Sequence, residues 1–339
     1  MTKIILVGID IAKNVFQVHG VDQAGKAVIK KSLRRSELRS FIAQLPVCTI
    51  AMEACGGAHY WARQFQALGH TVKLISPQFV KPFVKTNKND AHDAQAITEA
   101  ASRPDMRFVP IKNREQQDIQ SVHRIRSRLI AERTALVNQM RGLLAEYGEV
   151  MPQGVAKLRK RLPEILEDIT NELTSVIRQL CAELYEELLT LEKRIAEYDK
   201  KIKQILAANP VCRKLATIEG IGPLGATILL TALSDPKLFK NGRHFAAFLG
   251  LVPKQHSSGG RQRLLSISKR GDTYIRNLLV HGSRSVLQRV ARKKDGRSRW
   301  LMQLNERRGY NRTCVALANK NARIAWAIVV NDTQYKKAV

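Results

Sequence analysis

A stretch of about 40 residues in the middle of the chain carries apolar side chains in steps of three and four. This spacing is close to a heptad seam and predicts a helix of roughly 65 Å, at about 1.5 Å per residue. A helix of that length is too long for an ordinary globular packing unit. We therefore expect a coiled coil over residues 111–208, in which a second helix at about 114–146 pairs with the first, or the seam joins two chains. The seam residues are Leu166, Ile169, Leu173, Val176, Leu180, Leu184, Leu188, Leu191, Ile195, Tyr198, Ile202 and Ile205.

Short strands precede this helical region. Apolar or alternating segments occupy 4–10, 15–22, 26–33, 48–54 and 70–77. Ser36 is the expected N-cap of one intervening helix, Gly69 ends a second, and Pro77 stops the last strand. Three strands followed by helix–strand–helix–strand predict an α/β domain over residues 1–110, in which a β-meander leads into parallel βαβ units.

The positive charge of the chain is concentrated in its last third. The whole chain has 57 Lys and Arg against 29 Asp and Glu, a formal net charge of +28, and residues 209–339 hold 25 of the basic and 6 of the acidic residues. A net charge of +19 in one segment indicates a polyanionic partner, most simply nucleic acid. A basic protein at a membrane surface is the competing interpretation, but the sequence shows neither a clear amphipathic basic helix nor a lipidation motif.

The sequence also argues against secretion and membrane insertion. The N-terminus lacks the apolar region and cleavage site of a signal peptide, and no apolar run approaches the roughly 20 residues of a spanning helix. Five scattered cysteines form no disulfide framework and no CxxC zinc pair. We therefore expect a cytoplasmic protein.

Four acidic residues in the α/β region stand where they could share a metal ion. Asp10 ends the first predicted strand and Glu53 the fourth, while Asp90 and Asp93 lie three residues apart in the first turn of the helix after the fifth strand. Carboxylates are the ligands that Mg²⁺ or Mn²⁺ prefers, and such ions stabilise phosphoryl transfer. "VGID" also begins sugar-kinase-like ATPases, but no glycine follows before Gly20. His92 is expected on the adjoining helix face and not as a ligand.

The basic segment after Pro210 is expected to be mainly helical. "IEGIGPLGA" at 218–226 is typical of a helix-hairpin-helix turn, in which Gly220 and Gly222 let backbone amides approach a DNA phosphate. A plain tight turn between helices is the alternative. We expect a separate domain over residues 209–339.

A serine pair lies in a glycine-containing loop of the same segment, "GLVPKQHSSGGRQR" at 250–263. Arginines beside a serine could bind the nonbridging oxygens of a phosphate and help the hydroxyl to ionise. Ser257 and Ser258 are both candidates for a nucleophile, and a flexible loop that only contacts phosphate is the alternative. Only His256 could act as a nearby base, which argues against acyl transfer. The cations around the pair are Arg261, Arg263, Lys269, Arg270 and Arg276.

Six motifs together, in this order and spacing, resemble the DEDD transposases of the IS110 family and its IS1111 branch. They are "VGIDIAK", "MEACGGAHYWAR", "KNDAHDAQAI", "IEGIGPLGA", "GLVPKQHSSGGRQR" and "SKRGDTYIRNLL", and the resemblance covers nearly the whole chain. It implies an RNase H-like (RuvC-like) N-terminal domain whose acidic set is Asp10, Glu53, Asp90 and Asp93. The family serine directly precedes glycine, five residues after a proline, which matches Ser258 after Pro253 and leaves Ser257 as the second candidate.

The resemblance also implies an activity and partners. Family members are recombinases that insert and excise their own element in a prokaryotic cytoplasm, at the nucleoid. Those studied use a structured noncoding RNA, encoded by the element, that pairs with element-end and target DNA. They act as tetramers in which the acidic site of one protomer meets the serine of another. The expected product is a phosphoserine link to DNA; a metal-dependent Holliday-junction-type nuclease that hydrolyses with water is the rival hypothesis.

Overall fold

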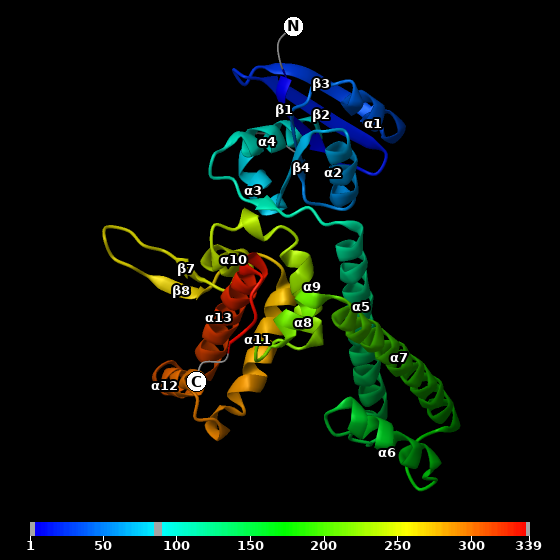
Figure 1. The fold of residues 1–339 in the computed structure, drawn as a ribbon. Coiled ribbons are helices and arrows are strands. Elements are labelled where there is room, and N and C mark those ends of the chain that lie inside the picture. The colour runs from blue at the N-terminus through cyan, green and yellow to red at the C-terminus, as the bar shows by residue number, and fades with distance from the viewer. Residues whose placement is uncertain (1–3, 85–89, 337–339) are drawn as a thin grey trace. The chain divides into compact units, whose positions relative to one another are not determined.

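The computed structural model describes residues 4–84 and 90–336, and its chain divides into two separately packed units (Figure 1). The first unit holds the residues up to Gln116 together with Ala232–Lys240, and the second holds Gln117–Thr231 and the chain from Asn241 onward. The helical middle and the basic C-terminal segment therefore fall in one unit.

The first unit is built on a six-stranded sheet in the order β3-β2-β1-β4-β5-β6. Strands β1, β4 and β5 are parallel to one another, and the other neighbouring pairs are antiparallel. This confirms the predicted α/β domain with a β-meander; the short β6 was not predicted. The strands are β1 (Ile4–Asp10), β2 (Val15–Asp22), β3 (Ala27–Arg34), β4 (Thr49–Glu53), β5 (Thr71–Ile75) and β6 (Phe108–Val109).

Helices cover both faces of this sheet. One buried cluster joins Ile9 and Met52 to the first two helices, and a second joins Leu6 and Ala51 to the helix that begins at Asp90. The first helix begins at Arg35, two residues earlier than a Ser36 cap would place it. The reason is that β3 continues to Arg34, whose N–H donates to the Glu37 carboxylate at 2.7 Å. The helices are α1 (Arg35–Ala43), α2 (Ala58–Ala67), α3 (Pro77–Val80), the 3₁₀ helix η1 (Lys81–Phe83) and α4 (Asp90–Ser102).

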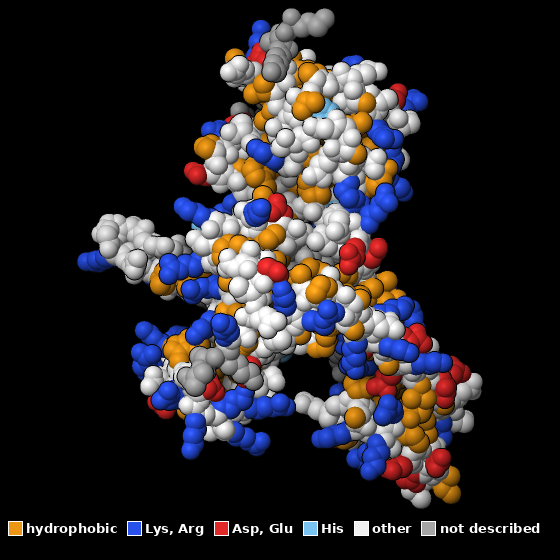
Figure 2. Space-filling view, viewed as in Figure 1, with side chains coloured by type: hydrophobic (Ala, Val, Ile, Leu, Met, Phe, Trp, Pro, Cys, Tyr) orange, Lys and Arg blue, Asp and Glu red, His pale blue; other side chains and the backbone are white. Residues whose placement is uncertain are grey.

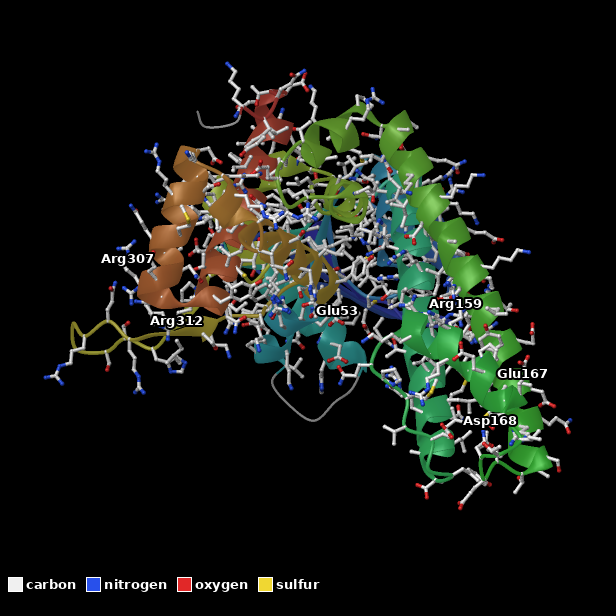
Figure 3. All side chains as sticks on the ribbon, turned by 90° about the horizontal axis from the view of Figure 1, so that it is seen from below. Glu53, Arg159, Glu167, Asp168, Arg307 and Arg312 are labelled. Atoms are coloured by element: carbon white, nitrogen blue, oxygen red, sulfur yellow. The ribbon has the colours of Figure 1, made fainter. Side chains whose placement is uncertain are left out.

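Two long helices, α5 (Arg114–Ala145) and α7 (Ser175–Ala208), pack on one apolar core with the shorter α6 (Val155–Glu167). The predicted helix at 114–146 is thus present and shares its core with the second helix of the same chain. Arg159 on α6 also donates to Glu192 on α7 at 2.6 Å (Figure 3).

The predicted continuous helix is interrupted between α6 and α7. The Asp168 carboxylate accepts from the N–H and hydroxyl of Thr170, and the Thr174 hydroxyl accepts from the N–H of Ile177 as a helix cap. This break shifts the buried stripe, so Ile169 is 92% exposed although the seam predicts burial. Pro163 lies inside α6, whereas Asn209 ends α7 as predicted and caps the next helix.

The rest of the second unit is mainly helical, with α13 at its centre. Helices α8, α10, α11 and α12 all pack against α13, and a two-stranded hairpin projects from this helical body (Figure 1). No described helix is long and apolar enough to cross a membrane. The elements are α8 (Pro210–Ala216), α9 (Pro223–Ala232), α10 (Gly242–Phe248), β7 (Pro253–Gln255), β8 (Leu264–Ile267), α11 (Thr273–Leu287), the 3₁₀ helix η3 (Val290–Arg292), α12 (Gly296–Arg308) and α13 (Tyr310–Asn331), while the 3₁₀ helix η2 (Pro236–Leu238) lies in the segment that belongs to the first unit.

A buried histidine ties α5 to α9 and α11. His123 Nε2 lies 2.9 Å from Thr227 Oγ1, and His123 Nδ1 lies 3.0 Å from the Tyr274 hydroxyl. The Thr227 hydroxyl itself donates to the Pro223 carbonyl. The neutral ring satisfies both bonds by donating from Nε2 and accepting at Nδ1. Burial, followed by the positive charge of Arg126, lowers the pKa of His123 to about 4.

We expect this histidine to make the second unit less stable in acid. The unfolded chain binds the proton with a pKa near 6.5 and the folded chain only near 4. The contribution of the neutral His123 to the free energy of unfolding is therefore complete above pH 6.5. It is lost as the pH falls toward 4, by about 3 kcal/mol in total. Urea unfolding at pH 7.5 and pH 4.5 measures the loss, and His123→Gln should flatten it. An equal pH dependence in the variant would contradict the assignment.

Candidate active site

The carboxylates of Asp10 and Glu53 stand side by side at the ends of two parallel strands. The register of β1 on β4 pairs Gly8 with Ala51, which aligns residue 10 with residue 53. Side chains alternate between the two faces of a strand, and Gly8 and Ala51 both face α4. Asp10 and Glu53 therefore point to the face that α4 covers, and both are half-buried. Figure 3 labels Glu53.

The thiol of Cys55 lies near both carboxylates. Its pKa is raised, chiefly by burial and then by the negative charges of Glu53 and Asp10. Both carboxylates thus act on one atom two residues beyond the end of β4. The other four cysteines are buried. The strand ends consequently form a local region of negative potential in an otherwise basic protein.

Gly8 allows α4 to lie directly on β1. A Cβ atom at this position would stand 2.2 Å from Thr98 Oγ1 and 2.5 Å from the Ala94 carbonyl oxygen, so only glycine fits without moving the helix. Asp93 immediately precedes Ala94 and is half-buried. The close approach therefore packs the first turns of α4 against β1 at Gly8, two residues before Asp10.

The donor set suits a hard divalent cation, because Asp10, Glu53 and Asp93 offer carboxylate oxygens from the strand ends and the adjoining helix. Asp90 is the first residue of α4, but its side chain lies outside the described part of the structure. Among the side chains that are described, no three His, Cys, Asp or Glu residues form a metal-binding group. His92 is exposed on α4.

A basic hollow that the sequence analysis did not identify lies at the same end of the sheet. It has a volume of about 680 Å³ and is lined by Arg34, Arg35 and Arg39 with Tyr60. Val15 pairs with Arg34 where β2 begins, just after β1 ends, so the hollow lies at this end of the sheet, on the face that α1 and α2 cover and not on the face of the carboxylates. The run "RRSELR" was the available signal.

Ser258 occupies the tip of the projecting hairpin. Gly259 and Gly260 both have positive φ, 54° and 75°, and the Arg261 N–H donates to the Ser258 carbonyl at 3.0 Å. This is the geometry of a tight two-residue turn with positive φ at both central positions, which glycine adopts without strain. The predicted flexible loop is therefore a hairpin with a defined turn, and Ser258, Arg261 and Arg263 are all exposed on it.

The two serines differ in their bonding. The Ser257 hydroxyl oxygen accepts from the Arg263 N–H at 3.2 Å and from Gln255 Nε2 at 3.0 Å. The Ser258 hydroxyl forms no hydrogen bond within residues 4–84 and 90–336. Ser257 thus helps to hold the hairpin, whereas the Ser258 hydroxyl points into solvent.

The other predicted nucleic-acid contacts fall into different environments. Lys269 and Arg270 are exposed, but Arg276 is only 6% exposed and donates to the Leu249 carbonyl at 3.3 Å. This burial favours a structural role for Arg276 at the base of the hairpin. Its sequence context gave no sign of burial, because a basic residue in a basic segment resembles a surface residue.

The turn between α8 and α9 presents one exposed glycine. Gly222 is exposed, and its carbonyl accepts from the Ala226 N–H at the start of α9. Gly220 instead has a φ of +90° and lies against the Gly282 carbonyl of α11, where a Cβ atom would be at 3.0 Å. Gly222 is thus the more exposed of the two predicted glycines, while Gly220 is half-buried.

The first unit is an α/β domain with two carboxylates at the ends of neighbouring strands, and the second is a basic, mainly helical unit with an exposed serine, which is the pattern of an enzyme that acts on DNA. Comparison with known proteins specifies this class. Residues 7–149 match the model of the IS110 DEDD transposases, and residues 212–299 match the model described as "Transposase IS116/IS110/IS902 family". The chain belongs to this transposase family.

Three relatives match over nearly their whole lengths. The chain is 52% identical to a probable family 20 transposase of Pseudomonas aeruginosa, over 97% of this chain and 98% of the relative. It is 47% identical to the transposase for insertion sequence element IS1111A of Coxiella burnetii, over 99% and 92%. The transposase for IS1328 of Yersinia enterocolitica is 42% identical, over 99% and 100%. The family resemblance seen in the motifs is thereby confirmed.

Proposed function

We propose that this transposase inserts and excises an insertion sequence through a phosphoserine DNA intermediate. The observation that carries the proposal is Ser258, an exposed serine with an unengaged hydroxyl on a tight glycine turn, between strands that also carry Arg261 and Arg263. A structured RNA encoded by the element would guide the reaction by base pairing, so that the protein itself recognises backbone and shape. The RNA follows from the family resemblance and suits the basic C-terminal segment.

The proposed step exchanges one phosphoester for another. Ser258 Oγ attacks a backbone phosphorus and loses its proton, while the bond from phosphorus to one strand-end oxygen breaks and that oxygen takes up a proton. Arg261 and Arg263 would neutralise the nonbridging oxygens. Because the serine ester conserves the bond energy, attack by another strand end religates DNA without ATP. Mg²⁺ or Mn²⁺ held by Asp10, Glu53, Asp90 and Asp93 would supply positive charge for the developing alkoxide.

We further propose that the first unit has an RNase H-like (RuvC-like) fold. The sheet order β3-β2-β1-β4-β5, with parallel β1, β4 and β5, supports it. The α8–α9 turn is proposed as the helix-hairpin-helix that contacts DNA phosphate, with Gly222 as its exposed glycine. Lys269 and Arg270, exposed beyond β8, are proposed to contact nucleic acid.

A label-transfer assay tests the function. Purified protein is incubated with Mg²⁺, labelled DNA spanning the element junction, and RNA transcribed from the flank of the element. We expect label at the mass of the protein on a denaturing gel, removable by protease and absent when the RNA is omitted. Cut DNA without any protein-bound label would replace this proposal by the rival one, a junction nuclease that hydrolyses with water at the carboxylate edge.

Self-association is proposed to involve the α6–α7 end of the second unit. Val176 and Leu180 lie one turn apart on α7 and are 65% and 46% exposed, which leaves apolar side chains uncovered in the chain. Figure 2 shows apolar surface over the part of the molecule where α6 and α7 lie. Such a stripe fits a second copy, as a coiled coil between chains would require.

We expect Val176→Glu with Leu180→Glu to weaken this association at least about tenfold, because two charges would be buried in an apolar contact. Mass photometry measures the shift from dimer or tetramer to monomer. Val47→Glu serves as a control, since Val47 is 69% exposed in the first unit. Unchanged masses in the double variant would locate the assembly contact elsewhere.

A further inference from the structure

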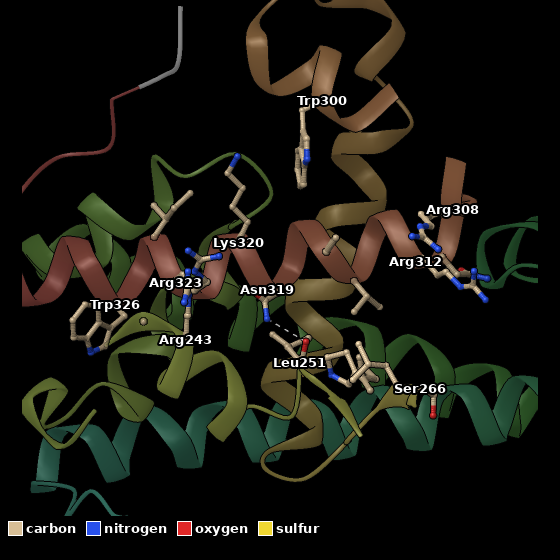
Figure 4. Close-up of a pocket in the computed structure, with 18 of the residues that line it drawn as sticks. Arg243, Leu251, Ser266, Trp300, Arg308, Arg312, Asn319, Lys320, Arg323 and Trp326 are labelled. Atoms are coloured by element: carbon tan, nitrogen blue, oxygen red, sulfur yellow. Dashed lines mark hydrogen bonds between the residues drawn. The ribbon is translucent and has the colours of Figure 1, made fainter. Parts of the chain in front are cut away.

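A long groove runs along one face of α13 in the second unit. Its volume is about 1700 Å³, and its walls come from α12, the start of α10 and the β7–β8 hairpin (Figure 4). Asn319 Nδ2 donates to the Leu251 carbonyl at 3.2 Å and so fixes the base of the hairpin to α13. The face from Arg312 to Trp326 spans about 21 Å at 1.5 Å per helical residue. The groove is long enough for several nucleotides.

The groove is lined by cations and contains no acidic residue among its lining side chains. Arg308 and Arg312 stand at one end, Arg243 and Arg323 toward the other, with Lys320 between them (Figure 4). Burial, and then the positive charges of Arg297 and Arg323, lower the pKa of Lys320. These cations repel one another, so an anion along the groove would relieve the repulsion.

Flat apolar surfaces lie between these charges. Trp300 lines the groove from α12, and Lys320 Nζ lies 4.5 Å from the centre of its ring. Trp326 lines the far end, and Leu264 on β8 is 59% exposed in the wall. Aromatic faces alternating with cations suit a ligand that has both stacking surfaces and repeated negative charges.

We propose that this groove binds a single-stranded segment of nucleic acid, with unpaired bases against Trp300 and Trp326 and phosphates on the flanking arginines. Unpaired bases expose the faces that a duplex hides, which is why a tryptophan-lined groove favours a single strand. At an axial rise of about 3.4 Å per nucleotide, 21 Å accommodates about six nucleotides of a stacked strand. The inference rests on the proposed function, since strand exchange and guide pairing both produce unpaired segments.

Fluorescence anisotropy with a labelled ten-nucleotide oligomer tests the groove, in parallel DNA and RNA forms and against a duplex of the same sequence. We expect wild-type protein to bind the single strands and its tryptophan fluorescence to fall. Arg308→Gln with Arg312→Gln should weaken binding about tenfold and reduce the salt slope by about 1.4, since each phosphate contact contributes about 0.7. Trp300→Leu or Trp326→Leu should weaken binding about tenfold without changing that slope.

A matched control variant distinguishes binding in the groove from general electrostatic attraction to the basic unit. Lys294→Gln with Arg299→Gln removes two exposed charges of the same unit outside the groove lining and should leave the salt slope nearly unchanged. Thermal melting checks that each variant folds. Equal binding by the groove variants and wild type overturns the inference. So does unchanged oligomer binding with altered self-association, which would make the groove a protein interface.

The groove and the proposed function can fail separately. Ser258→Ala should bind the oligomer as wild type does, because Ser258 does not line the groove. Oligomer binding that depends on the groove, without any covalent capture of DNA, would retain the groove and reject the phosphoserine reaction. Covalent capture with oligomer binding insensitive to every groove variant would retain the reaction and reject the groove.

Discussion

Ser258→Ala should remove covalent capture of DNA, a loss of at least about 1000-fold in rate, because the substitution removes the proposed nucleophilic hydroxyl and the neighbouring Ser257 hydroxyl is engaged in holding the hairpin. The variant should fold and bind DNA normally, since the Ser258 side chain is exposed and forms no hydrogen bond in the described chain. The measurement is the protein-linked label in the junction assay, with melting temperature and DNA binding recorded on the same preparations.

Ser257→Ala is the matched control for that experiment. Its hydroxyl accepts from the Arg263 N–H and from Gln255, so its loss should loosen the hairpin and slow capture by about tenfold or less. The opposite result, with capture surviving Ser258→Ala and abolished by Ser257→Ala, would move the nucleophile by one residue. Covalent capture that persists in both single variants would exclude a phosphoserine intermediate at this hairpin.

Asp10→Asn should reduce DNA cleavage at least about 1000-fold while leaving DNA binding intact, because it removes one anionic ligand from the strand-end site. The substitution preserves shape and removes only the charge. Asp105→Asn makes the same change at an exposed position of the first unit and should keep full activity. Cleavage that persists in Asp10→Asn would show that these carboxylates have only a structural role.

Cys55 provides a second readout of Asp10→Asn that is independent of cleavage. Its thiol pKa is raised in part by Glu53 and Asp10, so removing the Asp10 charge should lower that pKa and speed alkylation at neutral pH. Mg²⁺ binding should act in the same direction in the wild type, and a chelator should reverse it. The other four cysteines are buried, which makes the labelling selective. If Mg²⁺ does not change the rate of Cys55 alkylation, no ion binds at the strand ends that carry Asp10 and Glu53.

The sheet and the strand-end carboxylates could be predicted because their signals are local. Asp10 and Glu53 each follow a short apolar run, and two such strands placed in parallel must bring their ends together. The break between α6 and α7 could not be predicted from spacing, since Leu166, Ile169 and Leu173 continue the seam across it. Its cause, the turn made by Asp168, competes with the helix only through side-chain bonds that periodicity does not detect.

The tryptophan-lined groove depends on tertiary packing and had no local signal. Trp300 and Trp326 lie on different helices, and only the packing of α12 on α13 places them in one cavity. The burial of Arg276 could not be predicted from the sequence for a related reason. Its charge predicts exposure, whereas its carbonyl partners come from the hairpin base, which the chain reaches by folding back.

The exposed hairpin has a consequence for the inheritance of this sequence. Mutation at its tip removes no packed side chain, so a copy that loses Ser258 still yields an intact protein. We expect such a copy to occupy the same DNA and enter the same assemblies as active ones, and co-expression should lower transposition frequency in proportion to its dose. Mutation of Ser258 in one copy would then inhibit transposition of the active copies in the same genome. An inactive element would in this way limit the spread of related elements.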